Sequence, residues 1–89
     1  MRDARVKVGI PSPLHSYTKG AALVEADGVT VGELVDDLER RYPGIKFRMI
    51  DEQDRVRPHI LIWVGTKSVR DLKARIDGEV KIVAALSGG

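Results

Sequence analysis

Residues 29–44 read VTVGELVDDLERRYPG, and this stretch decides the fold. Thr30, followed three residues later by Glu33, fits a capping box, which starts a helix with Thr30 as its N-cap. Apolar residues then recur at helical spacing and form a single stripe: Val31, Leu34, Val35, Leu38 and Tyr42. A Pro-Gly pair stops the segment. The sequence therefore predicts one amphipathic helix over residues 30–42, with one face to bury.

Four further segments have the patterns of β-strands, and they supply the surface on which this helix can pack. Residues 5–10 alternate polar and apolar, and residues 21–26 are predicted to pair with them as a hairpin. Residues 59–64 are apolar on both faces, and residues 79–84 form the last strand.

The two connecting segments have weaker patterns. Ile45, Phe47 and Met49 alternate along the chain, which indicates a short edge strand before a polar turn. Residues 65–68 are interpreted as a turn, and residues 69–76 as carrying a helical turn.

The order of elements is therefore strand, strand, helix, short strand, strand, strand. One helix packed across one face of a mixed sheet buries the helix stripe and the sheet face together. The first and last strands can lie side by side in parallel, joined through the helical crossover. This is an α+β protein with the β-grasp, or ubiquitin-like, fold. We expect a single domain over residues 1–89 with a flexible C-terminal tail over residues 86–89.

Composition excludes several classes of function. The chain has 89 residues, a net charge of +2 and no cysteine, which excludes a disulfide scaffold, a thiolate metal site and a cysteine nucleophile. Basic residues are interspersed with acidic ones and aromatic residues are few, unlike a nucleic-acid-binding surface. No apolar run approaches the ~20 residues that span a bilayer. The start of the chain has no apolar stretch typical of a secretion signal, so we expect a cytoplasmic protein without membrane contact.

No catalytic constellation is recognisable in the sequence. Asp36 and Asp37 are adjacent on the predicted helix, so their side chains point apart and cannot face a common substrate. His15 and His59 are interpreted as surface residues, and two histidines cannot form a zinc site by themselves. Gly-rich phosphate-binding motifs are absent. The sequence therefore predicts a protein that is not an enzyme and binds neither a metal nor a cofactor.

The sequence ends in Gly88-Gly89, directly after the last strand and a short spacer. Two residues without side chains can enter a narrow channel and bring the terminal carboxylate to a reagent. A carboxylate is a poor electrophile, but joined to AMP it becomes an acyl group with a good leaving group. A sulfur or nitrogen nucleophile can then attack this acyl group and displace AMP. The alternative is a chain end without a function, where glycine is tolerated.

The whole chain resembles the ThiS/MoaD family of sulfur carrier proteins, which are ubiquitin-like and end in Gly-Gly. The resemblance covers the opening strand and four further stretches: Thr30-Val31-Gly32-Glu33-Leu34, Val64-Gly65, Asp77-Gly78-Glu79-Val80 and Ser87-Gly88-Gly89. Residues 10–14 and 18–20 are most similar to the branch that serves cysteine biosynthesis. His15 and Lys19 depart from that branch, which tends to have arginine and glycine at these positions.

This resemblance implies a reagent and not a catalyst. A MoeB/ThiF-type enzyme would use ATP to adenylate the Gly89 carboxylate, and a rhodanese or cysteine desulfurase would supply sulfur to form a thiocarboxylate. A downstream synthase would use that sulfur for cysteine, molybdopterin, thiamine or a thiolated tRNA base. Gly89 would carry the sulfur, Gly88 and Ser87 would belong to the thin tail, and Leu86 would anchor the tail at the mouth of the partner's channel.

Alternation along the strands predicts a docking face for these partners. With alternate residues of the central and last strands turned to the helix, Leu61, Trp63 and Val83 point outward. The alternative is that residues 45–57 fold over Trp63 and make it part of the core. Three other functions remain open: a ubiquitin-like modifier joined to lysines through Gly89, a β-grasp interaction module with an incidental tail, and a small enzyme.

Overall fold

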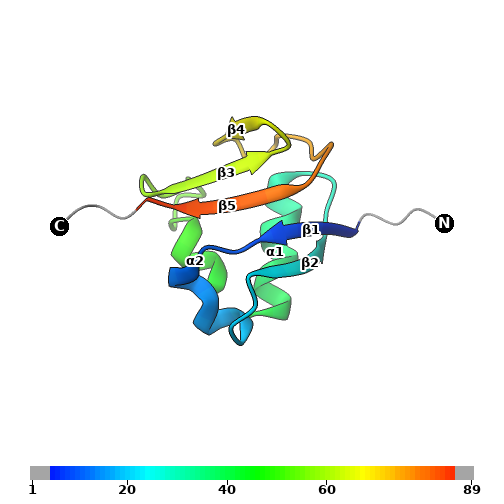
Figure 1. Cartoon of the computed structure of the whole chain (residues 1–89). Helices are drawn as coiled ribbons and strands as arrows, with labels where there is room; N and C mark the ends of the chain where they lie inside the picture. Colours follow the sequence, from blue (N-terminus) through cyan, green and yellow to red (C-terminus); the bar gives the residue numbers. More distant parts are fainter. Residues whose placement is uncertain (1–4, 86–89) are drawn as a thin grey trace.

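The computed structural model describes residues 5–85, which form a five-stranded mixed sheet with its helices on one face (Figure 1). In chain order the elements are β1 (Arg5–Gly9), the 3-10 helix η1 (Ser12–Thr18), β2 (Leu23–Asp27), α1 (Val31–Arg41), α2 (Ile45–Met49), β3 (Ile60–Val64), β4 (Lys67–Val69) and β5 (Val80–Ala84). The strand order is β2-β1-β5-β3-β4, with β1 and β5 parallel. The predicted β-grasp fold is confirmed.

The hydrophobic core fills the space between the sheet and the helices. The predicted alternation is confirmed in β3, where Ile60, Ile62 and Val64 are buried, and in β5, where Val80 and Ile82 are buried. The α1 residues that complete the core are those of the predicted stripe: Val31, Leu34, Val35 and Leu38. Each such side chain contributes about 1.5–3 kcal/mol relative to an exposed one. Burial on one face therefore fixes both the orientation of α1 and the register of the strands.

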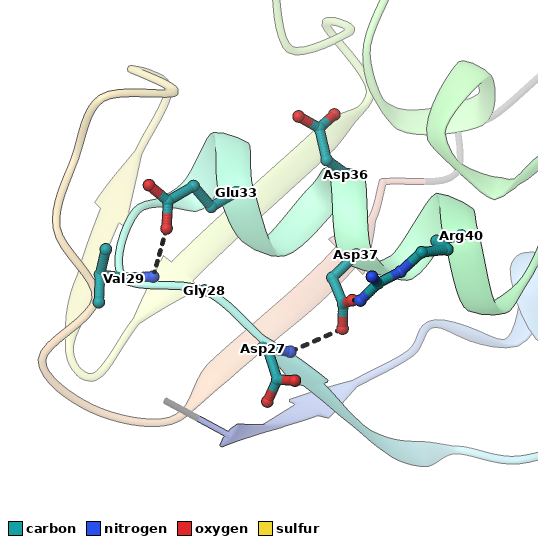
Figure 2. Close-up of a pocket in the computed structure, with 7 residues that line it drawn as sticks. All are labelled: Asp27, Gly28, Val29, Glu33, Asp36, Asp37 and Arg40. Atoms are coloured by element: carbon teal, nitrogen blue, oxygen red, sulfur yellow. Dashed lines mark hydrogen bonds and ion pairs between the residues drawn. The ribbon is translucent and has the colours of Figure 1, made fainter. Parts of the chain in front are cut away.

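The predicted capping box at the start of α1 is present. The Thr30 hydroxyl accepts a hydrogen bond from the backbone N–H of Glu33 at 3.2 Å. In return, the Glu33 carboxylate accepts one from the N–H of Val29 at 3.0 Å (Figure 2). The first bond satisfies one N–H group that the helix start leaves without a partner, and the second holds the residue before the N-cap against the first turn, which fixes α1 to begin at Val31.

The connection from β4 to β5 completes the start of α1. The N–H groups of Val31 and Gly32 donate to the carbonyls of Ala74 and Leu72, at 3.0 and 2.8 Å. The N–H of Ile76 donates in turn to the carbonyl of Val29 at 2.9 Å. This connection is therefore tied to the helix before the chain enters β5.

The helical turn predicted over residues 69–76 is reduced to a single hydrogen-bonded turn, in which the N–H of Ala74 donates to the carbonyl of Asp71 at 2.9 Å. Residues 67–69 form the edge strand β4, paired with β3, and were expected to lie partly in a turn. The following segment directs its carbonyls to α1, while its apolar side chains pack against the core: Leu72, Ala74 and Ile76. Its apolar spacing resembles that of a helix because an irregular segment crossing the core also buries a residue every few positions.

The edge strand predicted from Ile45, Phe47 and Met49 is wrong, because residues 45–49 form the short helix α2. Ile45 and Met49 are both fully buried, whereas Phe47 is 58% exposed. Buried side chains thus recur every four residues, as in a helix, and not every two, as in a strand. The carboxylate of Glu39 caps the start of α2 by accepting from the N–H groups of Gly44 and Lys46, each at 2.9 Å.

The Glu39 cap generates a prediction of pH dependence. Backbone hydrogen bonds from Gly44, and then from Lys46, hold the pKa of Glu39 below its ordinary value of 4.5. The contribution of the carboxylate is therefore complete above that value and is lost as pH falls through the lowered pKa of the folded state. Glu39→Gln should lower the free energy of unfolding by about 1 kcal/mol at neutral pH. Urea unfolding measures this at about pH 7 and pH 3. The difference in free energy of unfolding between Glu39→Gln and the wild type should be smaller at the lower pH. An equal difference at both pH values would contradict this role.

Gly28 generates a prediction about the turn from β2 into α1 (Figure 2). A methyl group on Gly28 would lie 2.6 Å from the backbone nitrogen of Leu34, too close for any real contact. Gly28→Ala should therefore lower the free energy of unfolding by about 3 kcal/mol. The matched control is Gly20→Ala, where the added methyl meets nothing within 4 Å and only the positive φ of 87° opposes it. That control should cost about 1–2 kcal/mol in the same urea titration. Equal losses would show that Gly28 is not closely packed.

Candidate functional site

The chain leaves the sheet at the end of β5. Ala85, the last described residue, donates its N–H to the carbonyl of His59 at 2.7 Å. This hydrogen bond continues the β3–β5 pairing by one residue and fixes the point at which the tail begins. The predicted tail residues Leu86, Ser87, Gly88 and Gly89 lie outside the described residues.

The predicted docking residues lie together on the sheet face turned away from the helices. Leu61 pairs directly with Val83, and Trp63 pairs with Lys81 in the same β3–β5 ladder. Side chains of paired residues lie on the same face of a sheet, so these four form one cluster. Leu61, Trp63 and Val83 are each half-buried and lie outside the core cluster. Their placement agrees with the predicted alternation, and their role in docking stays a prediction.

Trp63 is not covered by residues 45–57, the alternative that the sequence left open. α2 packs against α1 and η1, on the helix side of the sheet (Figure 1). Trp63 belongs to the opposite, open face, because it alternates with the buried Ile62 and Val64. A tryptophan that is half exposed on an open sheet face is typical of a binding surface.

The strand pairing adds residues that the sequence analysis did not single out. Gly9 pairs with Lys81 on one side and with Leu23 on the other. Leu23 is 60% exposed and so extends the apolar surface onto β2. A methyl on Gly9 would sit 3.4 Å from Cγ of Lys81, so the lysine stem lies close over this glycine. We call the whole set the open-face patch: Leu23, Leu61, Trp63, Lys81 and Val83.

A pocket lies beside the open-face patch, at the end of the sheet from which the tail leaves. It is lined by residues of β1, η1 and β5 and their connections: Gly9, Ile10, Pro11, Ser12, Pro13, Ala22, Lys81, Ile82, Val83 and Ala84. Its walls are mostly apolar, and Lys81 is its one charged residue. Such a pocket suits an apolar side chain of a protein partner better than a charged small molecule.

A second pocket, at the start of α1, is acidic, but its carboxylates are engaged in the fold (Figure 2). Asp37 is buried and accepts from the N–H of Asp27 at 2.8 Å and from Nε of Arg41 at 2.6 Å. Asp36 points to a different side of the helix, as predicted, and pairs with Nζ of Lys46 at 2.6 Å. Within residues 5–85, no group of three or more histidine, aspartate or glutamate side chains is placed to hold a metal ion.

The histidines do not form a site with each other. Nε2 of His15 lies 2.9 Å from the carbonyl of Ile10, so this half-buried ring holds the end of β1 against η1. His59 is exposed and contributes its backbone carbonyl to the start of the tail. None of the helices in the described range is long and apolar enough to cross a membrane.

A scan against models of known protein families found no match. The chain is 36% identical over 91 residues to the sulfur carrier protein CysO of Mycobacterium tuberculosis, with 94% of this chain and 98% of that protein covered. The chain belongs to the CysO sulfur carrier family. The predicted resemblance to ThiS/MoaD-type sulfur carriers with the β-grasp fold is thereby confirmed. Because the relative is CysO, the predicted relationship to the branch serving cysteine biosynthesis is confirmed as well.

Solved structures agree with this membership in the CysO family. The fold is similar to a chain of the BexX/CysO complex from Amycolatopsis orientalis, with a TM-score of 0.82, 35% identity, and coverage of 94% of this chain and 99% of that one. It is also similar to the small archaeal modifier protein 1 of Methanosarcina acetivorans, with a TM-score of 0.78 over the whole of both chains. At 22% identity, that second likeness concerns the fold alone.

The open-face patch generates a prediction about folding. Val83→Asp should lower the free energy of unfolding by only about 1–1.5 kcal/mol, because its side chain faces solvent and loses mainly strand propensity. Ile82→Asp, at a side chain that is 3% exposed, should lose more than about 4 kcal/mol by burying a charge. Thermal melts followed by circular dichroism measure both. If Val83→Asp lowered the free energy of unfolding more than Ile82→Asp did, the register of β5 would be wrong by one residue.

Proposed function

We propose that this CysO-family chain carries sulfur as a thiocarboxylate on its C-terminal residue, Gly89. The observation that carries the proposal is the position of the open-face patch next to the start of the tail. Val83 lies in the patch, and two residues later the N–H of Ala85 donates to the carbonyl of His59, where the tail begins. A partner that docks on the patch is therefore in place to receive the Gly-Gly end.

The chemistry of the proposed cycle requires two steps on the terminal carboxylate. First, a carboxylate oxygen of Gly89 attacks the α-phosphorus of ATP, which forms an acyl-adenylate and releases pyrophosphate. Second, a sulfide nucleophile attacks the acyl carbon and AMP leaves, so that one terminal oxygen is replaced by sulfur. The chain contains no cysteine, so the new group would be its sole thiol.

The chain itself would act as a reagent, with catalysis supplied by its partners. A MoeB/ThiF-type enzyme would bind ATP and carry out the first step. A rhodanese or cysteine desulfurase would provide the sulfur as a persulfide, and a thiol would reduce it to the sulfide level while being oxidised to a disulfide. A downstream synthase would accept it, and cysteine biosynthesis is the destination that family membership favours. We place this cycle in the cytoplasm, where ATP and these sulfur donors are present.

The open-face patch would supply the binding energy for the activating enzyme. Its centre is formed by Leu61, Trp63 and Val83, which offer apolar and aromatic surface of the kind enriched in interface cores. Leu86, which follows Ala85 in the sequence, would anchor the tail where it enters the enzyme. Val83→Asp would place a charge in this contact and should weaken docking at least tenfold while the chain stays folded.

Intact mass spectrometry tests the proposal. The purified chain should remain unmodified with ATP and magnesium alone, because it lacks the groups to activate its own carboxylate. Addition of a MoeB/ThiF-type enzyme should give an acyl-adenylate at Gly89. A sulfide source should then replace one oxygen by sulfur, and an alkylating reagent should label the product once, at the terminus.

The control is deletion of Gly89, which should leave thermal unfolding unchanged because the residue follows the last strand. This variant should accept no sulfur. Sulfur transfer to it, labelling before activation, or modification of an internal residue would show that the proposed chemistry is wrong. Adducts joined to lysines of other proteins through Gly89, without a thiocarboxylate, would instead favour a ubiquitin-like modifier.

A further inference from the structure

A second exposed surface lies on the helix side of the molecule and is formed by Phe47 and Arg57. Phe47, on α2, is 58% exposed. The Arg57 guanidinium lies over its ring, with Cζ 4.6 Å from the ring centroid. Nε of Arg57 also donates to the backbone carbonyl of Phe47 at 2.7 Å. Two interactions thus hold this arginine in one orientation, and we call the unit the Phe47–Arg57 pair.

The Phe47–Arg57 pair lies close to the start of the tail. The backbone N–H of Arg57 donates to the carbonyl of Met49, at the end of α2, at 2.9 Å. Two residues further along the chain, the carbonyl of His59 accepts from Ala85. α2 accordingly lies at the end of the molecule where β5 finishes (Figure 1). The tail therefore begins between the open-face patch on one side and the Phe47–Arg57 pair on the other.

No carboxylate forms a close ion pair with Arg57; the same holds for Arg48 on α2, whose guanidinium lies over the Tyr17 ring and donates to the Tyr17 hydroxyl. Arg41 pairs with Asp37, and Lys46 pairs with Asp36. In residues 5–85, no acidic side chain comes within 4 Å of the half-buried Arg57 guanidinium, and its electrostatic interaction with the Asp51 carboxylate acts over a longer distance. A partly desolvated arginine is normally paired. Here the terminal nitrogens of the guanidinium have no hydrogen-bond partner within the described chain.

We infer that the Phe47–Arg57 pair is a second docking element, which binds a carboxylate flanked by an apolar side chain on the enzyme that takes up the tail. The inference rests on the proposed function. An enzyme that surrounds the start of the tail must approach both sides of it. Stacking and the bond to Phe47 have already fixed the guanidinium, so little side-chain entropy remains to be lost on binding.

The chemistry of the pair selects a carboxylate on a protein. A guanidinium offers two parallel N–H donors that match the two oxygens of one carboxylate. The exposed Phe47 ring beside it offers apolar contact, and aromatic residues and arginine are enriched at the energetic centres of interfaces. A phosphate group would gain most from several free cations or backbone N–H donors, whereas the Phe47–Arg57 pair has one guanidinium beside an apolar ring and the neighbouring Arg48 is bonded to the Tyr17 hydroxyl.

The test compares Arg57→Gln and Phe47→Ala with the matched control Arg75→Gln. Arg75 is an exposed arginine on the connection that enters β5, at the opposite end of that strand from the tail. Its substitution removes the same charge. The assay is pyrophosphate release by the adenylating enzyme with the carrier chain as the varied substrate, at about 50 and 500 mM salt.

Arg57→Gln should raise KM for the carrier about tenfold at low salt with kcat unchanged, and the effect should shrink at high salt. Phe47→Ala should raise KM about fivefold at both salt concentrations, since it removes apolar contact. Arg75→Gln should stay within about twofold of the wild type. Arg57→Lys should fall between wild type and Arg57→Gln, because it keeps the charge and loses the paired donors. Thermal melts confirm that each variant is folded.

Wild-type KM values for the folded Arg57→Gln and Phe47→Ala variants would overturn the inference and leave the proposed function intact. A wild-type chain that is never adenylated would overturn both. Inhibition of the wild type by millimolar inorganic phosphate, absent in Arg57→Gln, would assign the pair to a phosphate ligand and overturn the carboxylate assignment. A fall in kcat with unchanged KM would also overturn it, because docking affects KM.

Discussion

The backbone N–H groups in the first turn of α1 are the constraint on which the rest of the structure depends. A helix start leaves these groups without partners inside the helix, and leaving them buried and unbonded is costly. Thr30 satisfies one of them, and the carbonyls of Leu72 and Ala74 satisfy two more. The connection that follows β4 is thereby held across the helix start. It then enters β5 in the register that joins the two halves of the sheet.

The central position of β5 bears on the proposed use of the chain end. β5 is the middle strand of the sheet, between β1 and β3, and it is also the strand that leads into the tail. Lys81 is paired with Gly9 of β1 and with Trp63 of β3, whereas Val83, nearer the tail, is paired with Leu61 of β3 alone. The tail therefore starts from a fixed point, and a partner can locate the chain end by binding the fold.

The charges of the helix side are largely used to hold the fold together. Asp37 joins the end of β2, at Asp27, to the end of α1, at Arg41. Glu39 holds α2 in place through backbone N–H groups. The guanidinium groups of Arg48 and Arg57, in contrast, form no close ion pair with a carboxylate of residues 5–85, and each is held against an aromatic ring. The two surfaces beside the tail are chemically different, one an apolar sheet face and the other a stacked cation.

The sequence by itself determined α1 with its cap, the buried alternation of β3 and β5, and the outward position of Leu61, Trp63 and Val83. These features follow from periodicity within one element, because each strand or helix reports which of its own faces is apolar. Tertiary structure decided the rest: α2, β4, the row that brings Leu23 beside Lys81, and the exposure of Arg57. Their determinants are contacts outside the element itself: the Glu39 carboxylate of α1 for α2, and the α1 N–H groups, about 40 residues earlier in the chain, for the segment after β4. A local pattern carries no information about hydrogen bonds that form only when distant segments meet.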